Sequence, residues 1–305
     1  KSNMNILITG ATGFLGTSLV KCLSKDGHSI KIITRNISKA SKILGDDFDF
    51  YQWDHSTLEP PIEAINDSEV VINLMGETVG GLWLPSKKRA ILQSRTLGTK
   101  NLVAAIIKSD SKPELLISAS AVGYYGNRGN EKLTENSEPG DNFLSEVCKA
   151  WEDQAKSATE SGLRVATLRF APIVGPNGGF LDQQLPLAKM GLLGPLGSGK
   201  QWWPWVHIDD AISAIKYVIN TQISGPLNVV SPKPIDQITF SKALAAFFNR
   251  PAIVPAPSFA IRMMLWGFAD ELLFSRKVIP QKLLDAGYKF KFVKITEAIK
   301  ASLKH

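Results

Sequence analysis

The sequence has little of three features that would place it in a special class: cysteine, long apolar runs and runs of like charge. Its 305 residues include two cysteines, Cys22 and Cys148, too few for a disulfide framework or a structural zinc site. No apolar run approaches the roughly 18 residues that predict a membrane span. A strand-like segment already begins at Asn5, so we expect no secretory leader. These absences predict a cytoplasmic protein without a metal site or membrane contact.

Charge gives little indication of a partner. Thirty-five basic and 28 acidic residues leave a formal charge of +7, but the basic residues are scattered. The densest cluster, residues 87–89, is more typical of a solvated helix face than of a nucleic-acid-binding stripe. We therefore expect a small-molecule substrate and no nucleic acid, and we leave a homodimer open.

Strand and helix signals alternate through the first 170 residues. Expected strands are 5–9, 29–34, 48–53, 70–74, 115–119 and 163–170; expected helices are 14–23, 85–108 and 144–159. Such repeated β-α-β units predict an α/β fold, a doubly wound parallel sheet of the Rossmann type. After Phe170 the chain becomes rich in glycine and proline, and prolines punctuate the last third. We expect a main domain over 4–174 with 206–230 returning to it, and a smaller C-terminal lid or substrate domain over 175–205 and 231–305.

A glycine-rich turn between the first strand and the first helix carries the strongest local signal. Gly10, Gly13 and Gly16 stand three residues apart, where a dinucleotide fingerprint must lie. Gly10 allows the tight turn, Gly13 lets backbone approach a pyrophosphate, and Gly16 permits close helix–sheet packing. The N-terminus of the helix offers free N–H groups to the phosphates.

The end of the second strand indicates which dinucleotide binds. A chain that prefers NAD places Asp or Glu about 20 residues after the turn, to hold the ribose 2′-hydroxyl. Here Arg35 stands 19 residues after Gly16. A guanidinium suits a 2′-phosphate and offers no acceptor to a hydroxyl, so we predict NADP(H) as the cofactor.

The glycine spacing resembles that of extended short-chain dehydrogenases/reductases and nucleotide-sugar epimerases. Further motifs are residues 71–77 (VINLMGE), 94–95 (SR), 117–126 (ISASAVGYYG), 143–152 (FLSEVCKAWE), 194–199 (GPLGSG) and 205–210 (WVHIDD). Together they resemble the YfcH-type epimerase-family proteins, an atypical extended branch also labelled SulA-like cell-division inhibitors. The resemblance covers nearly the whole chain and implies an NADP(H)-binding Rossmann fold with a small C-terminal domain.

Site residues follow from this resemblance. It implies cofactor contacts from Gly10, Thr12, Gly13, Phe14, Leu15, Gly16, Arg35, Asp54, Leu74, Met75, Gly76, Ser118, Pro172 and Ile173. Ser120 would be the active-site serine, with Ser118 its near neighbour. Arg95 would offer a positive charge in the region where the family carries a helix-borne asparagine.

The proton-transfer pair of such enzymes is missing from the sequence. The Tyr-x-x-x-Lys pair exchanges a proton with the substrate and grips the cofactor ribose. Alignment on Glu152 places Leu144 where the tyrosine belongs and Cys148 where the lysine belongs. Tyr124 and Tyr125 follow Ser120 closely, so each is a candidate proton donor and also a candidate packing residue.

Two functions remain open at this point. The first is an NADP(H)-dependent oxidoreductase or epimerase-like enzyme acting on a small polar substrate, nucleotide sugars included, with an uncharged or hydrophobic substrate equally permitted. The second is a non-catalytic NADP(H)-binding protein that senses or regulates, which the missing Tyr-Lys pair would allow. Trp202, Trp203 and Trp205 would either line a substrate cleft or pack the lid onto the core.

Overall fold

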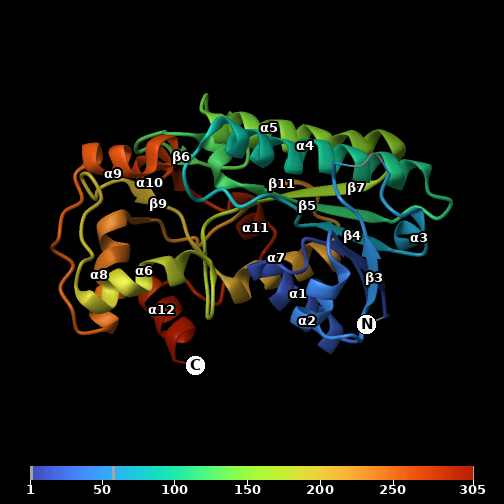
Figure 1. The fold of residues 1–305 in the computed structure, drawn as a ribbon, viewed down its shortest axis with the longest axis horizontal. Helices are drawn as coiled ribbons and strands as arrows, with labels where there is room; N and C mark the ends of the chain where they lie inside the picture. The colour runs from blue at the N-terminus through green and yellow to red at the C-terminus, as the bar shows by residue number, and fades with distance from the viewer. Residues whose placement is uncertain (1–2, 57–58, 305) are drawn as a thin grey trace.

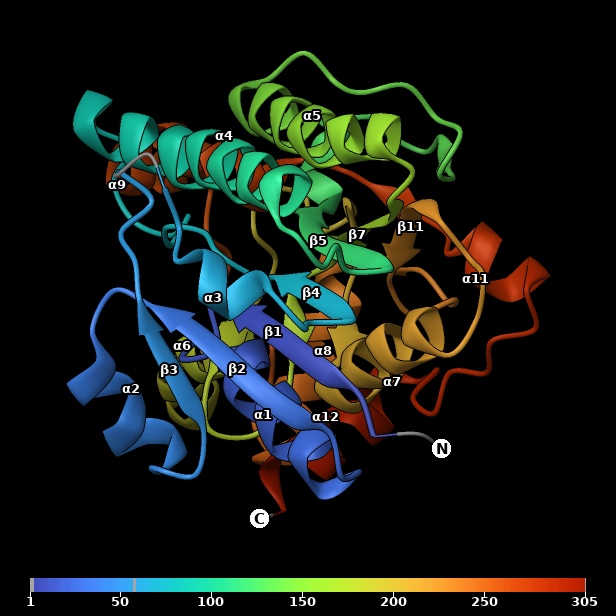
Figure 2. The ribbon, with the colours of Figure 1, turned by 90° about the vertical axis from the view of Figure 1, so that its right-hand side faces the viewer.

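Seven parallel strands form the central sheet of the protein. A computed structural model describes residues 3–56 and 59–304. The strands are β1 (Asn5–Thr9), β2 (Ser29–Thr34), β3 (Asp49–Gln52), β4 (Val70–Asn73), β5 (Leu115–Ala121), β7 (Arg164–Phe170) and β11 (Gly225–Val229). Their order is β11-β7-β5-β4-β1-β2-β3, and every neighbouring pair is parallel (Figures 1 and 2). The chain winds in opposite directions from β1, so a topological switch point lies between β1 and β4.

Helices cover both faces of the sheet, as repeated right-handed crossovers require. One face carries α1 (Phe14–Lys25), α2 (Ile37–Leu44), α7 (Ile208–Ile219) and α11 (Gln281–Asp285); the other carries α3 (Ile62–Ile65), α4 (Pro85–Lys108), α5 (Phe143–Lys156) and the 3-10 turn η2 (Ser157–Ser161) (Figure 1). The predicted α/β doubly wound sheet is therefore confirmed.

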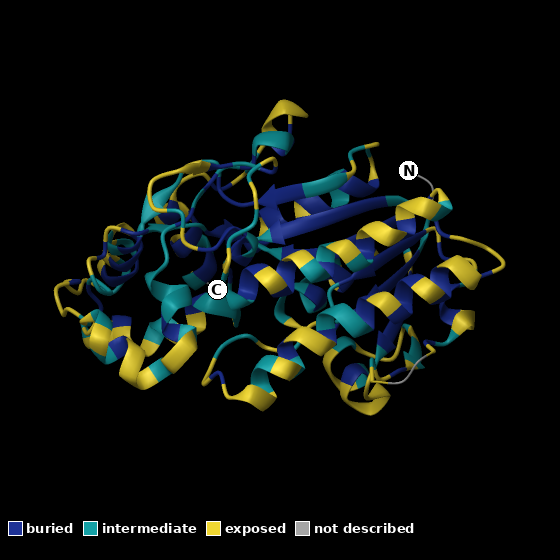
Figure 3. Ribbon diagram, turned by 90° about the horizontal axis from the view of Figure 1, so that it is seen from above, coloured by how far each residue is buried: buried dark blue, intermediate teal, exposed yellow. Residues whose placement is uncertain are grey.

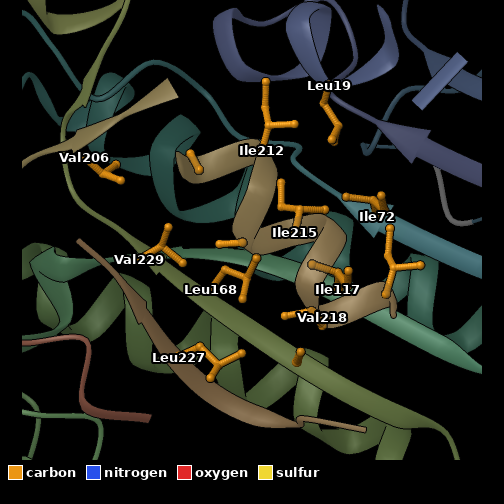
Figure 4. Packing of buried hydrophobic residues seen from close by; sticks show 14 of the residues in the cluster. Leu19, Ile72, Ile117, Leu168, Val206, Ile212, Ile215, Val218, Leu227 and Val229 are labelled. Carbon is orange, nitrogen blue, oxygen red and sulfur yellow. The ribbon is translucent and has the colours of Figure 1, made fainter. Parts of the chain in front are cut away.

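Two apolar cores hold these layers together because alternate strand residues face opposite sides. On the α1 and α7 side, α7 places Ile212, Ile215 and Val218 close to the strand residues Ile72 and Ile117 (Figure 4). The core on the other side joins α3, α4 and the end of α5 to the sheet. The helices show a buried stripe toward the sheet and exposed residues outside (Figure 3). The sheet is therefore a rigid base for the loops at its edge.

Most of the C-terminal part packs as a separate cluster beside the carboxyl ends of the strands. Its elements are α6 (Gly179–Met190), β9 (Trp202–Trp203), β12 (Ile235–Asp236), α8 (Gln237–Phe247) and α12 (Ile295–Leu303). Beside it lie α9 (Ser258–Leu265), η3 (Trp266–Phe268) and α10 (Ala269–Leu273), of which Phe268 packs against Trp83 on the side of α4 and α5. Phe240 and Leu244 of α8 share a core with Ala298 and Ile299 of α12. Short strands β8 (Ile173–Val174) and β10 (Val206–His207) connect this cluster to the sheet.

Part of the expected lid instead returns to the main sheet. Strand β13 (Lys277–Val278) pairs with β6 (Lys132–Leu133), which follows the short turn η1 (Val122–Tyr125). Val278, Leu283 and Tyr288 belong to the main core, although the sequence predicts a lid throughout 231–305. Prolines and short helices do not reveal which core a segment joins, since that depends on long-range packing.

Candidate cofactor and substrate clefts

The turn after β1 is built so that only glycine fits at its two ends. Gly10 has φ +69°, and a Cβ there would lie 2.5 Å from the carbonyl oxygen of Leu74. A Cβ on Gly16 would collide with the carbonyl oxygen of Gly10. The backbone of α1 therefore approaches β1 and β4 closely, with Gly13 as its N-cap. Its first N–H groups face a narrow turn of the kind that binds a pyrophosphate.

A cleft of about 290 Å³ opens at this turn, over the switch point of the sheet. It is lined by Thr9, Gly10, Ala11, Thr12, Gly13, Ile33, Thr34, Arg35, Trp53, His55, Leu74, Met75, Gly76, Glu77, Thr78 and Ser94. Seven of the expected cofactor residues belong to it. The shape and the glycine turn fit a dinucleotide, since a side chain at Gly10 or Gly16 would close the cradle.

Arg35 supplies an unengaged positive charge to this cleft. The residue is exposed, and among the described residues its guanidinium has no hydrogen-bond or ion-pair partner. The carboxylates of Asp54 and Glu77 lie close enough to Arg35 to interact with it electrostatically. The pKa of Asp54 is lowered mainly by a hydrogen bond from the Ser56 backbone, and the pKa of Glu77 is lowered mainly by a hydrogen bond from Lys87. Both stay charged at neutral pH, so a cation at Arg35 is needed to make this end of the cleft attractive to a phosphate.

Trp53 and His55 also line the cleft, and the sequence analysis did not select them. Trp53 is 5% exposed, and its indole N–H is buried without an acceptor among the described residues. A buried N–H donor without an acceptor is costly, and this one lies beside a ligand cleft, so a bound ligand is the natural acceptor. Trp53 directly follows β3, and residues at the carboxyl ends of parallel strands face the ligand. That rule could have found it.

A second, larger cleft of about 640 Å³ lies between the sheet and the C-terminal cluster, and Thr78 lines both clefts. Its floor is formed by residues 121–123, at and just after the end of β5, and by residues 170–172, at and just after the end of β7. Its roof comes from α6, β9, α8, α9, η3 and α10. Trp203 and Trp205 line it and also pack within the C-terminal cluster. Trp202 lines neither cleft, and its indole N–H donates to Asn130 Oδ1 at 2.9 Å. Among the described residues, Thr78 is the only one that lines both clefts, so the two clefts adjoin there.

The expected catalytic residue Ser120 lies outside both clefts. Its hydroxyl is buried and donates to Glu152 Oε1 at 2.6 Å. Glu152 in turn accepts two hydrogen bonds from Arg169, each of 2.8 Å. Ala121, the next residue of β5, lines the larger cleft instead. Alternate residues of a strand face opposite sides, so the geometry assigns Ser120 to a buried ion-pair network and not to the cleft.

Tyr125 is a core residue, which corrects its selection as a candidate proton donor. It has no exposed surface, its hydroxyl donates to Asn228 Oδ1 at 2.7 Å, and burial raises its pKa to about 12. Tyr124 is half-buried, and its ring lies 3.5 Å from the guanidinium carbon of Arg169. It faces a third cavity, between α5 and β7, and not the cofactor cleft.

Arg95 lies close to the cofactor cleft without lining it. It donates to the carbonyl oxygen of Glu77 at 2.9 Å and lies over the ring of Trp151, and burial lowers its pKa. A Cβ on Gly76 would lie 3.0 Å from the guanidinium carbon. The cation therefore supports residues 76–77, which line the cleft.

Most of the remaining residues that we expected to contact the cofactor do not line the cofactor cleft. Pro172 lines the larger cleft, whereas Ile173, Leu15, Ser118 and Asp54 line neither cleft. Ser118 is fully buried beside Asn73. The side chain of Phe14 packs under the loop at Gly178 and Gly179, so only its backbone can face a phosphate.

Leu144 and Cys148 occupy the first two turns of α5. Leu144 lines the larger cleft and lies against Gly123, where it presents an aliphatic side chain. Cys148 is fully buried, and burial raises the pKa of its thiol to about 12. Neither side chain can exchange a proton with a ligand at neutral pH. The described residues contain no group of three or more potential metal ligands, and none of their helices is long and apolar enough to span a bilayer.

Comparison with known proteins gives matches along the whole chain. Residues 6–230 match the NAD dependent epimerase/dehydratase family, and residues 256–302 match a domain of unknown function, DUF1731. The chain is 34% identical to the epimerase family protein SDR39U1 homolog, chloroplastic, of Arabidopsis thaliana, covering 100% of this chain and 88% of that one. It is 34% identical to the epimerase family protein YfhF of Bacillus subtilis, covering 95% and 94%.

Solved structures are similar over the same length. The crystal structure of human epimerase family protein SDR39U1 (isoform 2) with NADPH is 28% identical, with a TM-score of 0.88, covering 99% of this chain and 100% of that one. The nucleoside-diphosphate sugar epimerase of Corynebacterium glutamicum is 33% identical, with a TM-score of 0.79, covering 99% of this chain and 58% of that one.

Proposed function

The chain belongs to the NAD dependent epimerase/dehydratase family, and from that premise we propose that it is an NADP(H)-dependent oxidoreductase or epimerase-like enzyme of small molecules. The observation that carries the proposal is Arg35, a free guanidinium at the end of β2 in the cleft of the glycine turn. A similar human protein has been solved with NADPH, which supports the same cofactor here.

Different residues of the first cleft would bind different parts of the cofactor. The turn at Gly10 and Gly13 would hold the pyrophosphate through backbone N–H groups, and Arg35 would pair with the 2′-phosphate. Trp53 would give its unused indole N–H to the adenosine end. Residues 74–78 lead toward the larger cleft, so the nicotinamide would lie near Thr78. When bound, the nicotinamide supplies or accepts a hydride.

A titration of the purified protein with NADPH and NADH, followed by fluorescence, tests the proposal. We expect tight binding of NADPH and binding of NADH that is at least tenfold weaker, since NADH has no 2′-phosphate. Equal affinities would remove Arg35 from its role, and binding of neither would overturn the proposal.

A second candidate function is a non-catalytic NADP(H)-binding regulatory or redox-sensing protein. Leu144 and Cys148 favour it, because neither can serve as the proton-transferring pair. It is distinguished by cofactor binding without turnover on any substrate, and by a partner whose affinity differs between NADP⁺ and NADPH. The cytoplasmic location and the narrower YfcH-type, SulA-like label stay predictions from the sequence.

A further inference from the structure

We propose that the larger cleft takes an uncharged molecule with an aromatic or branched apolar body, and not a nucleoside diphosphate sugar. The inference rests on the proposed function, because it names the substrate class of that site. Of the substrates that the sequence leaves open, it selects the uncharged, hydrophobic class, and it follows from the lining and charges of the cleft and from the apolar surface beside it.

The lining of the cleft is aromatic on several sides. Phe180 of α6, Trp203 of β9 and Phe240 of α8 form a three-ring cluster, with centroids 5.4 to 5.7 Å apart. Further rings come from Phe170, Trp205, Phe268 and Phe274. Apolar surface removed from water contributes about 25 cal/mol per Å², so a ligand with a large apolar body gains most here. A sugar would place its hydroxyl groups against rings that offer few partners.

None of the described residues that line the cleft is a free cation that could receive a diphosphate. Among the described residues that line it, Glu271 and Arg276 are the ionisable ones, and they pair at 2.6 Å. Arg276 also donates to the carbonyl oxygen of Gly126 at 2.9 Å, and its side chain is 7% exposed. Burying a phosphate without a compensating cation costs several kcal/mol. The charges of this cleft therefore cancel before any ligand enters.

The neutral polar groups of the cleft suit a carbonyl or hydroxyl oxygen. Gln183, Gln184 and Thr78 line it. The indole N–H of Trp205, another lining residue, is buried without an acceptor among the described residues. One or two neutral donors around an apolar pocket fix the orientation of a ligand without demanding charge.

An apolar surface adjoins the cleft at α9 and η3. Leu265 and Phe268 line the cleft, and the side chain of Trp266 between them is 66% exposed. Phe259 and Met264, on α9, are 68% and 73% exposed. Large apolar side chains exposed together mark a binding surface more often than a solvated one. Trp266 lies between two residues that line the cleft, so this part of the surface borders the cleft and suits a poorly soluble ligand.

Calorimetric titration of the NADPH-saturated protein with 2-acetylnaphthalene and with UDP-glucose tests this inference. We expect 2-acetylnaphthalene to bind at least tenfold more tightly. Gly80 lines the cleft, and a Cβ there would meet nothing within 4 Å, so Gly80→Trp is chosen to place a large side chain at the cleft. This variant should bind the ketone at least tenfold more weakly with NADPH affinity unchanged, and the matched control Gly80→Ala should resemble the parent protein.

Each outcome bears on one proposal. Tighter binding of UDP-glucose, no binding of the ketone, or ketone affinity that Gly80→Trp leaves unchanged would overturn the apolar substrate class while the cofactor proposal stands. If NADPH itself does not bind, the cofactor proposal fails. The two titrations are then made without cofactor, where the same order of affinities is expected because the rings of the cleft are already in place.

Discussion

Removal of the Arg35 side chain should abolish the preference for NADPH without affecting NADH. Charge-assisted hydrogen bonds contribute about 1.5–3 kcal/mol each, so loss of one such contact lowers NADPH affinity about 10- to 150-fold. Asp54 and Glu77 interact electrostatically with Arg35 and remain after its removal. Without Arg35 these charges repel the 2′-phosphate, but Lys87, paired with Glu77 at 2.8 Å, offsets part of the repulsion, so we expect a loss within that range at low salt. Because Arg35 is exposed, its contribution to the affinity for NADPH should fall as the salt concentration rises.

The assay is a titration of Arg35→Ala with NADPH and with NADH at two salt concentrations, beside Lys39→Ala. Lys39 is an exposed cation of α2, four residues along the chain, and does not line the cleft. The control should keep the NADPH preference, whereas the Arg35 variant should bind both nucleotides equally. If Arg35→Ala weakens NADH as much as NADPH, or the two variants behave alike, the assignment of the 2′-phosphate to Arg35 is wrong.

Three further predictions concern the turn, the buried network and a buried histidine. Gly16→Ala should lower NADPH affinity at least tenfold and lower the melting temperature, because its Cβ would collide with the Gly10 carbonyl oxygen; unchanged binding would contradict the close approach. Ser120→Ala should cost about 1–3 kcal/mol in urea unfolding by leaving Glu152 short of a donor, with NADPH affinity unchanged; a protein that keeps its stability but loses turnover would restore Ser120 to the chemistry. Burial lowers the pKa of His207 to about 4 from 6.5, so the unfolded chain binds the proton first and stability should fall by about 3 kcal/mol as pH drops from 6.5 to 4. In His207→Asn the side chain can still cap the helix, but the variant should lose about 3 kcal/mol less stability on acidification than the parent. If the stability of variant and parent falls in parallel with pH, the assignment of this loss to His207 is wrong.

The main sheet follows from local sequence patterns. Buried parallel strands read as apolar runs, and 70–74 (VVINL) predicts β4 to within one residue. The helix expected over 85–108 is found with those bounds, because Pro85 is favourable at a first turn. The segment 277–290 was harder. Its pairing with β6 joins residues more than 100 positions apart, and its packing near β11 is also long-range, so no local pattern encodes either contact.

The candidate site was predictable where backbone geometry determines it, and less so where side chains do. The tight turn predicts glycine at Gly10 and the close helix–sheet packing predicts it at Gly16, and in the structure a Cβ at either position would collide with a backbone carbonyl oxygen. The family resemblance implies Ser120, but one residue along a strand reverses the face, and Ala121 lines the cleft instead. Tyr125 was selected for its nearness in sequence, which says nothing about the buried hydrogen bond to Asn228, 103 residues away.

Leu144 bears on both halves of the functional question. It lines the larger cleft beside Gly123, at the position where the related enzymes' pattern would place the proton-donating tyrosine. An aliphatic side chain there removes a hydroxyl and adds apolar surface at the same time. A sugar in this cleft would find neither a hydroxyl partner nor a polar surface at this position. An apolar ligand would also lack the hydroxyl, but it would pack against the aliphatic side chain. Leu144 and the aromatic roof both add apolar surface to this cleft, which is what the proposed apolar substrate needs.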